Sequence, residues 1–277
     1  MSGCLVCPVC RRRKEENALI REGGAYRCCS GHSFDTARAG YVNLMLSQQS
    51  SKKRHGDDKQ MLISRRSFLE KGFYEPLADA VTECVTSLAG ESAVVVDAGC
   101  GEGYYTQRIR RALPRADIYG VDISKDALIL AAKRGADITL TAASAAELPL
   151  ASGCADVLLS IFAPVFPEEF ARVLKPGGTL IRAVPLEDHL YGLKSAIYDN
   201  AYKNPPESGE LPGFQLDRIK RLGFELSLES REDIEALFMM TPYYYKTSRA
   251  DQEKLLSRTS LRTQAEFGVI VSKAAKL

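Results

Sequence analysis

The chain has 277 residues, of which 45% are hydrophobic and 26% charged, and its formal net charge is +2. This composition is that of a globular protein, and the length allows one large domain with a small one beside it. We find no apolar run of the roughly 18 residues that span a bilayer and no secretion signal, so we expect a cytoplasmic protein with no membrane partner.

Basic and cysteine side chains are concentrated at the N-terminus. Basic residues outnumber acidic ones in residues 1–75, and the reverse holds for the rest of the chain. A basic excess in a small segment is typical of a surface that meets a polyanion, although it also serves solubility. Five of the eight cysteines lie in the first thirty residues: Cys4, Cys7, Cys10, Cys28 and Cys29. Because cytosolic thiols stay reduced, such a cluster indicates metal binding more than disulfides.

The first cysteine pair, CPVC at residues 7–10, is followed by Cys28-x3-His32. This order is typical of a zinc ribbon or knuckle, with a glycine pair at 23–24 providing the reversal. We predict one structural zinc ion held by four residues: Cys7, Cys10, Cys28 and His32. Zinc is favoured over buried or redox-active thiols because so short a segment has too little apolar surface to fold alone.

Two further cysteines leave an alternative ligand in each half of the site, Cys4 in the first and Cys29 in the second. Cys4-x2-Cys7 and Cys29-x2-His32 also have metal-ligand spacing.

The stretch AVVVDAGCGEGYYT, from Ala93, predicts a strand, a glycine turn and a helix starting near Tyr104. Its pattern is D-x-G-x-G-x-G, not the G-x-G-x-x-G of a dinucleotide site. A carboxylate before the turn suits an ammonium group, such as that of S-adenosylmethionine, better than a diphosphate. We therefore predict that Asp97, Gly99 and Gly101 bind the methionine end of this cofactor. Cys100 is interpreted as a packing residue.

Two downstream segments complete the predicted cofactor site. IYGVDIS ends a second strand at Asp122, whose two carboxylate oxygens could accept both ribose hydroxyls. TAASAAELPL, at 141–150, predicts a strand end and loop in which Ser144 borders the adenine.

The remaining segments continue the same architecture. Strands are predicted at 155–160 and 179–185, a helix at 168–178 closed by Pro-Gly-Gly, and a terminal strand pair in GFELSLES and EFGVIVSKA. Asp156 is interpreted as a structural residue at a strand start. The fold class is therefore α/β: a doubly wound, Rossmann-like class I methyltransferase sheet of about seven strands, with a small N-terminal zinc-binding domain.

In combination, these motifs resemble the bacterial 23S rRNA guanine-N1 methyltransferase family, which pairs a Cys-Cys-Cys-His zinc domain with a class I methyltransferase domain. The matching stretches span residues 7 to about 200 and are CPVC, CSGHSFDTARAGYVNL, RRSFLEKGFYEPL, DAGCGEGYYT, VDISK, IFAP and HLYGLKSAIY. The C-terminal quarter matches loosely, chiefly through TPYYYK. The chain departs from the family in its additional Cys4 and Cys29 and in its basic RRRK after CPVC.

The resemblance implies methylation of N1 of a guanine in a 23S rRNA hairpin, by a homodimer that uses S-adenosylmethionine and does not act on DNA. It places the zinc ligands on the same four residues and cofactor contacts on Tyr74, Gly101, Glu102 and His189. Resistance to macrolides such as tylosin is the phenotype that one branch implies, and the sequence does not identify the guanine. The implied domains are a zinc-binding RNA-recognition domain (1–45), a basic linker and helix (46–75) and a methyltransferase domain (76–277). We expect His55, in the linker, to be solvated.

No catalytic residue follows from the sequence. N1 of neutral guanine carries a proton, so methyl transfer needs an acceptor for it and stabilisation of charge on O6. Asp188, Glu187 and solvent are the candidates, and no spacing selects among them. His189 could border the cofactor or receive the proton. Phe162, after a predicted strand, could stack on the guanine or belong to the core.

Two other functions share some of these features. A small-molecule methyltransferase would use the same donor motifs but leaves the zinc domain and the basic N-terminus unexplained. A non-catalytic zinc RNA-binding protein is disfavoured because the acidic and glycine positions of the donor site are all intact.

Overall fold

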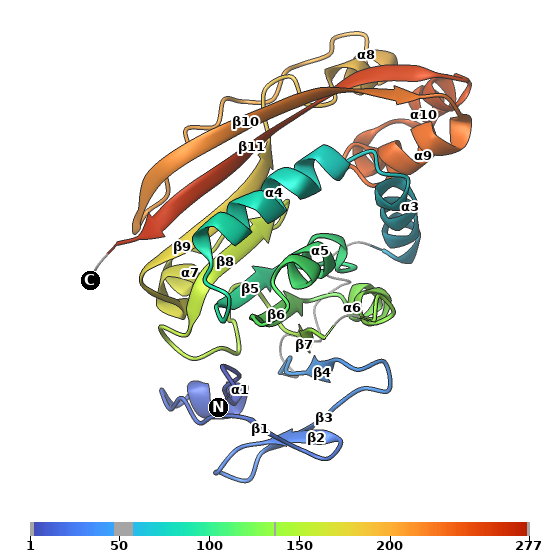
Figure 1. The fold of residues 1–277 in the computed structure, drawn as a ribbon. Helices are drawn as coiled ribbons and strands as arrows, with labels where there is room; N and C mark the ends of the chain where they lie inside the picture. The colour runs from blue at the N-terminus through green and yellow to red at the C-terminus, as the bar shows by residue number, and fades with distance from the viewer. Residues whose placement is uncertain (1–2, 47–57, 136, 276–277) are drawn as a thin grey trace.

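The computed structural model describes residues 3–46, 58–135 and 137–275. Within these residues a large eight-stranded sheet is covered by helices, and a small three-stranded sheet lies at one end of the molecule (Figure 1). The strands of the large sheet, in spatial order, are β10 (Phe214–Leu228), β11 (Leu261–Ala274), β9 (Leu174–Pro185), β8 (Ala155–Ile161), β5 (Val94–Ala98), β6 (Asp117–Asp122), β7 (Thr139–Ala142) and β4 (Val42–Asn43). His55 lies outside the described residues.

The large sheet confirms the doubly wound class and exceeds the expected strand number by one. Strands β4, β7, β6, β5, β8 and β9 pair in parallel, and β11 is antiparallel to both β9 and β10. The extra strand, β4, comes from the N-terminal segment and pairs with β7. Because parallel strands end at the same edge, the carboxyl ends of β5, β6 and β8 lie together, where doubly wound folds bind ligands.

Helices connect the strands and flank the sheet. Those of the described chain beyond the N-terminal segment are α3 (Lys59–Glu70), α4 (Glu75–Leu88), α5 (Tyr104–Ala112), α6 (Lys125–Ala132), α7 (Pro167–Val173), α8 (Tyr191–Ile197), α9 (Arg231–Met239) and α10 (Arg249–Leu256), with a short 3-10 turn η1 (Tyr244–Lys246). Four of them begin where a side-chain oxygen accepts a backbone N–H three residues on; the capping residues are Asp58, Ser124, Ser230 and Ser248.

The helix predicted over residues 168–178 is shorter in the structure. It ends at Val173, and Leu174 already pairs with Ala155 as the first residue of β9. Pro176 could not continue a helix because it lacks a backbone N–H. The terminal strand pair is confirmed as the long antiparallel ladder of β10 and β11.

The N-terminal segment forms a small ribbon against the sheet. It contains α1 (Pro8–Arg11), β1 (Ile20–Glu22), β2 (Ala25–Arg27) and β3 (Ser33–Asp35). The turn between β1 and β2 contains Gly23 at φ 61°, a conformation that glycine adopts without strain. Leu5 and Leu19 of the ribbon are buried in one cluster with Val96, Tyr119 and Leu158 of the large sheet. The ribbon therefore covers part of one sheet face, and the predicted three-domain division stays a prediction.

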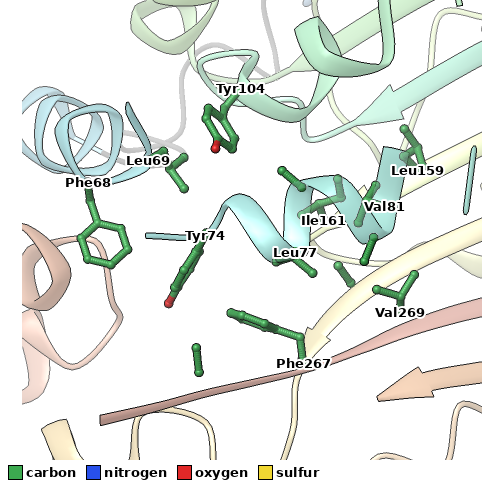
Figure 2. Packing of buried hydrophobic residues seen from close by; sticks show 14 of the residues in the cluster. Phe68, Leu69, Tyr74, Leu77, Val81, Tyr104, Leu159, Ile161, Phe267 and Val269 are labelled. Atoms are coloured by element: carbon green, nitrogen blue, oxygen red, sulfur yellow. The ribbon is translucent and has the colours of Figure 1, made fainter. Parts of the chain in front are cut away.

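A second buried cluster surrounds the edge at which the parallel strands end. Figure 2 shows Tyr74 and Leu77, near the start of α4, on the side of the helix that faces Phe267 of β11. The rings of Tyr74 and Phe267 meet edge to face, with centroids 5.0 Å apart. This packing fixes the start of α4 and the end of β8, where both line a cavity.

Candidate active site and zinc centre

The four predicted zinc ligands lie together in the ribbon. The ligand atoms of Cys7, Cys10, Cys28 and His32 all lie within 4.8 Å of one another. The Sγ atoms of Cys10 and Cys28 are 3.8 Å apart, and His32 Nδ1 lies 3.3–3.5 Å from the three sulfurs. Tetrahedral zinc, with Zn–S bonds of about 2.3 Å, places two sulfurs about 3.8 Å apart. The group therefore fits a structural zinc ion.

The two additional cysteines lie outside this group. Cys4 lies in a bend before it, and its backbone N–H donates to the Tyr119 hydroxyl at 3.0 Å. Cys29 is exposed. The geometry thus favours the ligand set that excludes Cys4 and Cys29.

The basic residues after CPVC differ in their surroundings: the first is held in an ion pair, and later ones are exposed. Arg11 forms a two-pronged ion pair with Glu169 of α7, at 2.8 and 2.9 Å, and also donates to the Leu148 carbonyl. Both charged side chains are largely buried. Arg13 and Lys14 are exposed. Arg11 therefore holds the ribbon to the sheet layer and is not available to a polyanion.

A cavity of about 530 Å³ opens at the carboxyl ends of β5, β8 and β9. Its lining includes six of the eight residues predicted to contact the cofactor: Tyr74, Asp97, Gly99, Gly101, Glu102 and His189. Asp122 and Ser144 are not among the lining residues.

Asp97, the penultimate residue of β5, presents a buried carboxylate to this cavity. Its Oδ2 accepts a hydrogen bond from the Thr106 hydroxyl at 2.6 Å. Its Oδ1 is buried and has no hydrogen-bond partner among the described residues. Burial raises the pKa of Asp97 to about 7. A buried oxygen without a partner fits the ammonium group predicted there.

The glycine loop after Asp97 is held by a close contact at Gly99 and by a hydrogen bond to Asp122. Gly99 has φ 93°, and a Cβ on it would lie 2.4 Å from that of Ala163, in the loop after β8. Only glycine therefore lets the two loops meet. The Gly101 N–H donates to Asp122 Oδ2 at 2.8 Å, and Asp122 Oδ1 accepts from Ser124 N–H at 2.7 Å. Asp122 thus holds the loop in place from the end of β6.

The structure also shows the surroundings of Glu102 and Ser144. Glu102 is buried and paired with Arg134, whose Nε lies 2.9 Å from Glu102 Oε2. Its Oε1 has no partner among the described residues, and burial raises its pKa. Ser144 is half-buried in the loop after β7 and accepts from Ala146 N–H.

His189 lies between β9 and α8, with Nδ1 accepting the Glu266 N–H at 3.3 Å. The proton of the neutral ring is therefore on Nε2. Burial lowers the pKa of His189 to about 3, with a smaller contribution from Lys194. The ring is neutral at physiological pH, with Nε2–H as its hydrogen-bond donor.

The two carboxylates proposed as proton acceptors are on the surface. Asp188 pairs with Lys203 at 2.7 Å, and Glu187 pairs with Arg221. Neither lines the cavity. The carboxylates that do line it are Asp97 and Glu102.

Sequence reasoning missed several cavity residues from distant segments. Arg65 of α3 lines the cavity and donates to the Met240 carbonyl at 3.4 Å. Tyr104 and Tyr105, at the start of α5, have buried hydroxyls without partners among the described residues. Tyr243 follows α9. The motifs RRSFLEKGFYEPL and TPYYYK contained the signal, but only the fold shows that these segments meet.

Phe162 lines the cavity from the loop after β8 and is 45% exposed. Its φ is 54°, a left-handed conformation that non-glycine residues rarely adopt. Such strain is often found at functional sites.

The sheet order, the glycine loop and the cavity define a class I methyltransferase. A family model described as a methyltransferase domain matches residues 95–178, and a zinc-ribbon model described as RlmA, N-terminal, matches residues 5–53. In the described chain, no helix has both the length and the apolar character that crossing a membrane requires.

Curated relatives identify the family more closely. A putative 23S rRNA (guanine-N(1)-)-methyltransferase from Bacillus subtilis is 31% identical over 264 residues, covering 90% of this chain and 89% of the relative. The 23S rRNA (guanine(748)-N(1))-methyltransferase of Streptomyces fradiae is 35% identical, covering 70% of this chain and 67% of the relative. A putative enzyme of the same name from Micromonospora griseorubida is 36% identical, covering 68% of both chains. The chain therefore belongs to the 23S rRNA (guanine-N1)-methyltransferase family, and is an S-adenosylmethionine-dependent methyltransferase with a zinc ribbon.

Proposed function

We propose that this protein transfers the methyl group of S-adenosylmethionine to N1 of a guanine in a hairpin loop of 23S rRNA. The observation that carries the proposal is the cavity at the end of β5, which combines the unpartnered Asp97 oxygen with the aromatic Phe162. The relatives supply the identity of the acceptor, because their names specify N1 of a guanine in this RNA.

The cofactor would occupy the side of the cavity formed by the glycine loop. Asp97 and the loop at Gly99 and Gly101 would hold its methionine end, and Asp122 its ribose. The remaining assigned contacts are Tyr74, Glu102, Ser144 and His189. Asp122 and Ser144 lie beyond the cavity lining, and Asp122 accepts hydrogen bonds from the Gly101 and Ser124 N–H groups.

The sulfonium of the bound cofactor supplies a methyl group that is already reactive, so the chain mainly aligns donor and acceptor. A bond would form between the methyl carbon and N1 as the carbon–sulfur bond breaks, and the N1 proton would pass to solvent. N1 is on the Watson–Crick edge, so the base must be unpaired to enter, which favours a loop. Phe162 would stack on it, and the neutral His189 could donate to O6.

The zinc ribbon would contribute to RNA binding through its exposed basic residues, such as Arg13 and Lys14. A 23S rRNA substrate implies that the protein works in the cytoplasm. A homodimer would double this positive surface and place the RNA in a cleft between subunits.

Primer extension tests the proposal. Purified protein and S-adenosylmethionine are incubated with unmodified 23S rRNA, and reverse transcription is then read across the product. A methyl group on N1 blocks pairing, so one new stop is expected at a guanine in a hairpin loop. Absence of a stop, or methylation only of small molecules by the same preparation, would reject the rRNA assignment.

A further inference from the structure

A second concave surface is lined by α8, the helix that follows His189, and by the start of β11. It is an open depression of about 420 Å³ between α8 and the start of β11, and we call it the α8–β11 depression. Its lining residues are Gly192, Ser195, Ala196, Arg258, Ser260, Leu261 and Arg262. A Cβ on Gly192 would lie 2.5 Å from the Arg262 carbonyl oxygen, so the helix and the strand meet there at backbone distance.

The two arginines of this depression are not neutralised by the protein. Arg258 and Arg262 are exposed and form no ion pair within the described residues. Neighbouring cations differ in this respect: Arg249 and Lys254 of α10 pair with Glu253 and Asp199. Two guanidinium groups without an ion-pair partner among the described residues are suited to an anion with several oxygens, such as a phosphate.

An exposed aromatic ring lies on the same helix face. Tyr191 is 38% exposed, and Ser195, four residues further along α8, donates its hydroxyl hydrogen to the Tyr191 carbonyl at 2.9 Å. Residues four apart share one face of a helix, so Tyr191 is beside the depression that Ser195 lines. An exposed ring next to phosphate-binding groups is a feature of single-stranded RNA sites, where bases stack on aromatic side chains.

The depression is also placed to act together with the active site. His189 and Leu190, directly before α8, line the cofactor cavity, whereas Gly192 and Ser195 line the depression. In Figure 1, α8 and α10 lie at the opposite end of the molecule from the zinc ribbon. An RNA held at both ends would pass the cavity between them.

We propose that the α8–β11 depression is a second RNA-binding site, in which Arg258 and Arg262 bind backbone phosphate and Tyr191 stacks on an unpaired base. The site fixes the RNA on the side of the cavity remote from the zinc ribbon. This inference rests on the proposed rRNA substrate.

The test is binding of 23S rRNA over a range of salt concentrations. The double variant Arg258→Ala/Arg262→Ala should bind more weakly, and its plot of log affinity against log salt should be less steep by about 0.7–0.9 for each lost phosphate contact. Tyr191→Ala should bind about 5- to 100-fold more weakly with an unchanged salt slope, since stacking is uncharged, and Tyr191→Phe should retain binding.

Arg249→Ala is the matched control, because this arginine is 94% exposed on α10 and already paired with Glu253. Affinity and slope equal to this control in the double variant would overturn the second site. S-adenosylmethionine affinity, measured by calorimetry, should be the same in all these variants. Wild-type protein that binds no rRNA would instead reject the proposed function, so the two failures are distinguishable.

Discussion

The Thr106 hydroxyl donates to one carboxylate oxygen of Asp97 at 2.6 Å, and the other oxygen is buried without a partner among the described residues. The pKa of Asp97 is raised to about 7, chiefly by burial. A ligand ammonium would reverse this effect, because an adjacent positive charge favours the ionised carboxylate. The site therefore favours a cation and should respond to pH near neutrality.

Cofactor affinity should fall as the pH is lowered through 7. Pairing with the ammonium requires ionised Asp97, so protonation of the free site competes with binding. Between pH 7.5 and pH 6 we expect affinity to fall about 5- to 10-fold, and it should also fall above about pH 8 as the cofactor's amino group loses its proton. Calorimetry at several pH values measures this.

Two variants separate this cause from a general effect of pH. Asp97→Asn should bind S-adenosylmethionine more weakly than the wild type, by about 1.5–3 kcal/mol. Its affinity should no longer fall as the pH is lowered from 7.5 to 6. Thr106→Val removes a hydrogen bond that lowers the Asp97 pKa, so its midpoint should move to higher pH. A wild-type profile that is flat from pH 6 to 7.5 would show that Asp97 is not the partner of the ammonium.

Replacing Asp122 tests the ribose assignment. Asp122→Ala should weaken S-adenosylmethionine binding by about 1–3 kcal/mol, through lost hydrogen bonds to a charged acceptor. Part of the loss would arise from the glycine loop, whose Gly101 N–H loses its acceptor. Asp126→Ala, an exposed position in the first turn of α6, is the control. Equal S-adenosylmethionine affinities of Asp122→Ala and Asp126→Ala would show that Asp122 does not bind the ribose.

Arg11 and Arg13 should have different roles although they are two residues apart. Arg11→Ala should lower the free energy of unfolding by about 1–3 kcal/mol, because the largely buried Glu169 loses two charged hydrogen bonds and keeps Arg172 as its ion-pair partner. Arg13→Ala should leave stability unchanged and weaken RNA binding. Urea denaturation and an rRNA-binding assay measure the two effects. Equal stability of both variants would contradict the anchoring role.

Zinc loss should affect the methyltransferase sheet as well as the ribbon. Cys10→Ser removes a buried ligand, and the ribbon's Leu5 and Leu19 share a cluster with sheet residues. We expect loss of bound metal and one thermal transition at lower temperature. Cys29→Ser, at an exposed cysteine outside the ligand group, should retain metal and stability. A separate, unshifted transition for the sheet in Cys10→Ser would mean that the ribbon folds independently.

The parts of the fold and site that the sequence predicted correctly depend on residues close together in the chain. The run ending in Asp97 and the first glycine specify strand, turn and helix over a few residues, and the ligand spacing of Cys7 and Cys10 is equally local. The strand at 42–43 could not be predicted, since two residues have no periodicity. Neither could the pairing of Arg11 with Glu169, because the residues are 158 positions apart and only tertiary folding brings them together.

Phe162 combines an exposed ring with a left-handed backbone, and substitutions by alanine and glycine separate the effects of the two. Phe162→Ala and Phe162→Gly both remove the ring and its contact with Phe267, whose centroid is 5.5 Å away. Only glycine relieves the strain of φ 54°, so Phe162→Gly should be more stable than Phe162→Ala by about 1 kcal/mol.

Both variants should methylate 23S rRNA poorly and keep near-normal S-adenosylmethionine affinity, whereas Phe162→Tyr, which retains an aromatic face, should stay active. Urea denaturation, calorimetry and primer extension supply the three measurements. Full activity in Phe162→Gly would show that the ring belongs to the cavity wall and does not stack on the guanine. Equal stability of the alanine and glycine variants would show that the left-handed conformation costs this loop nothing.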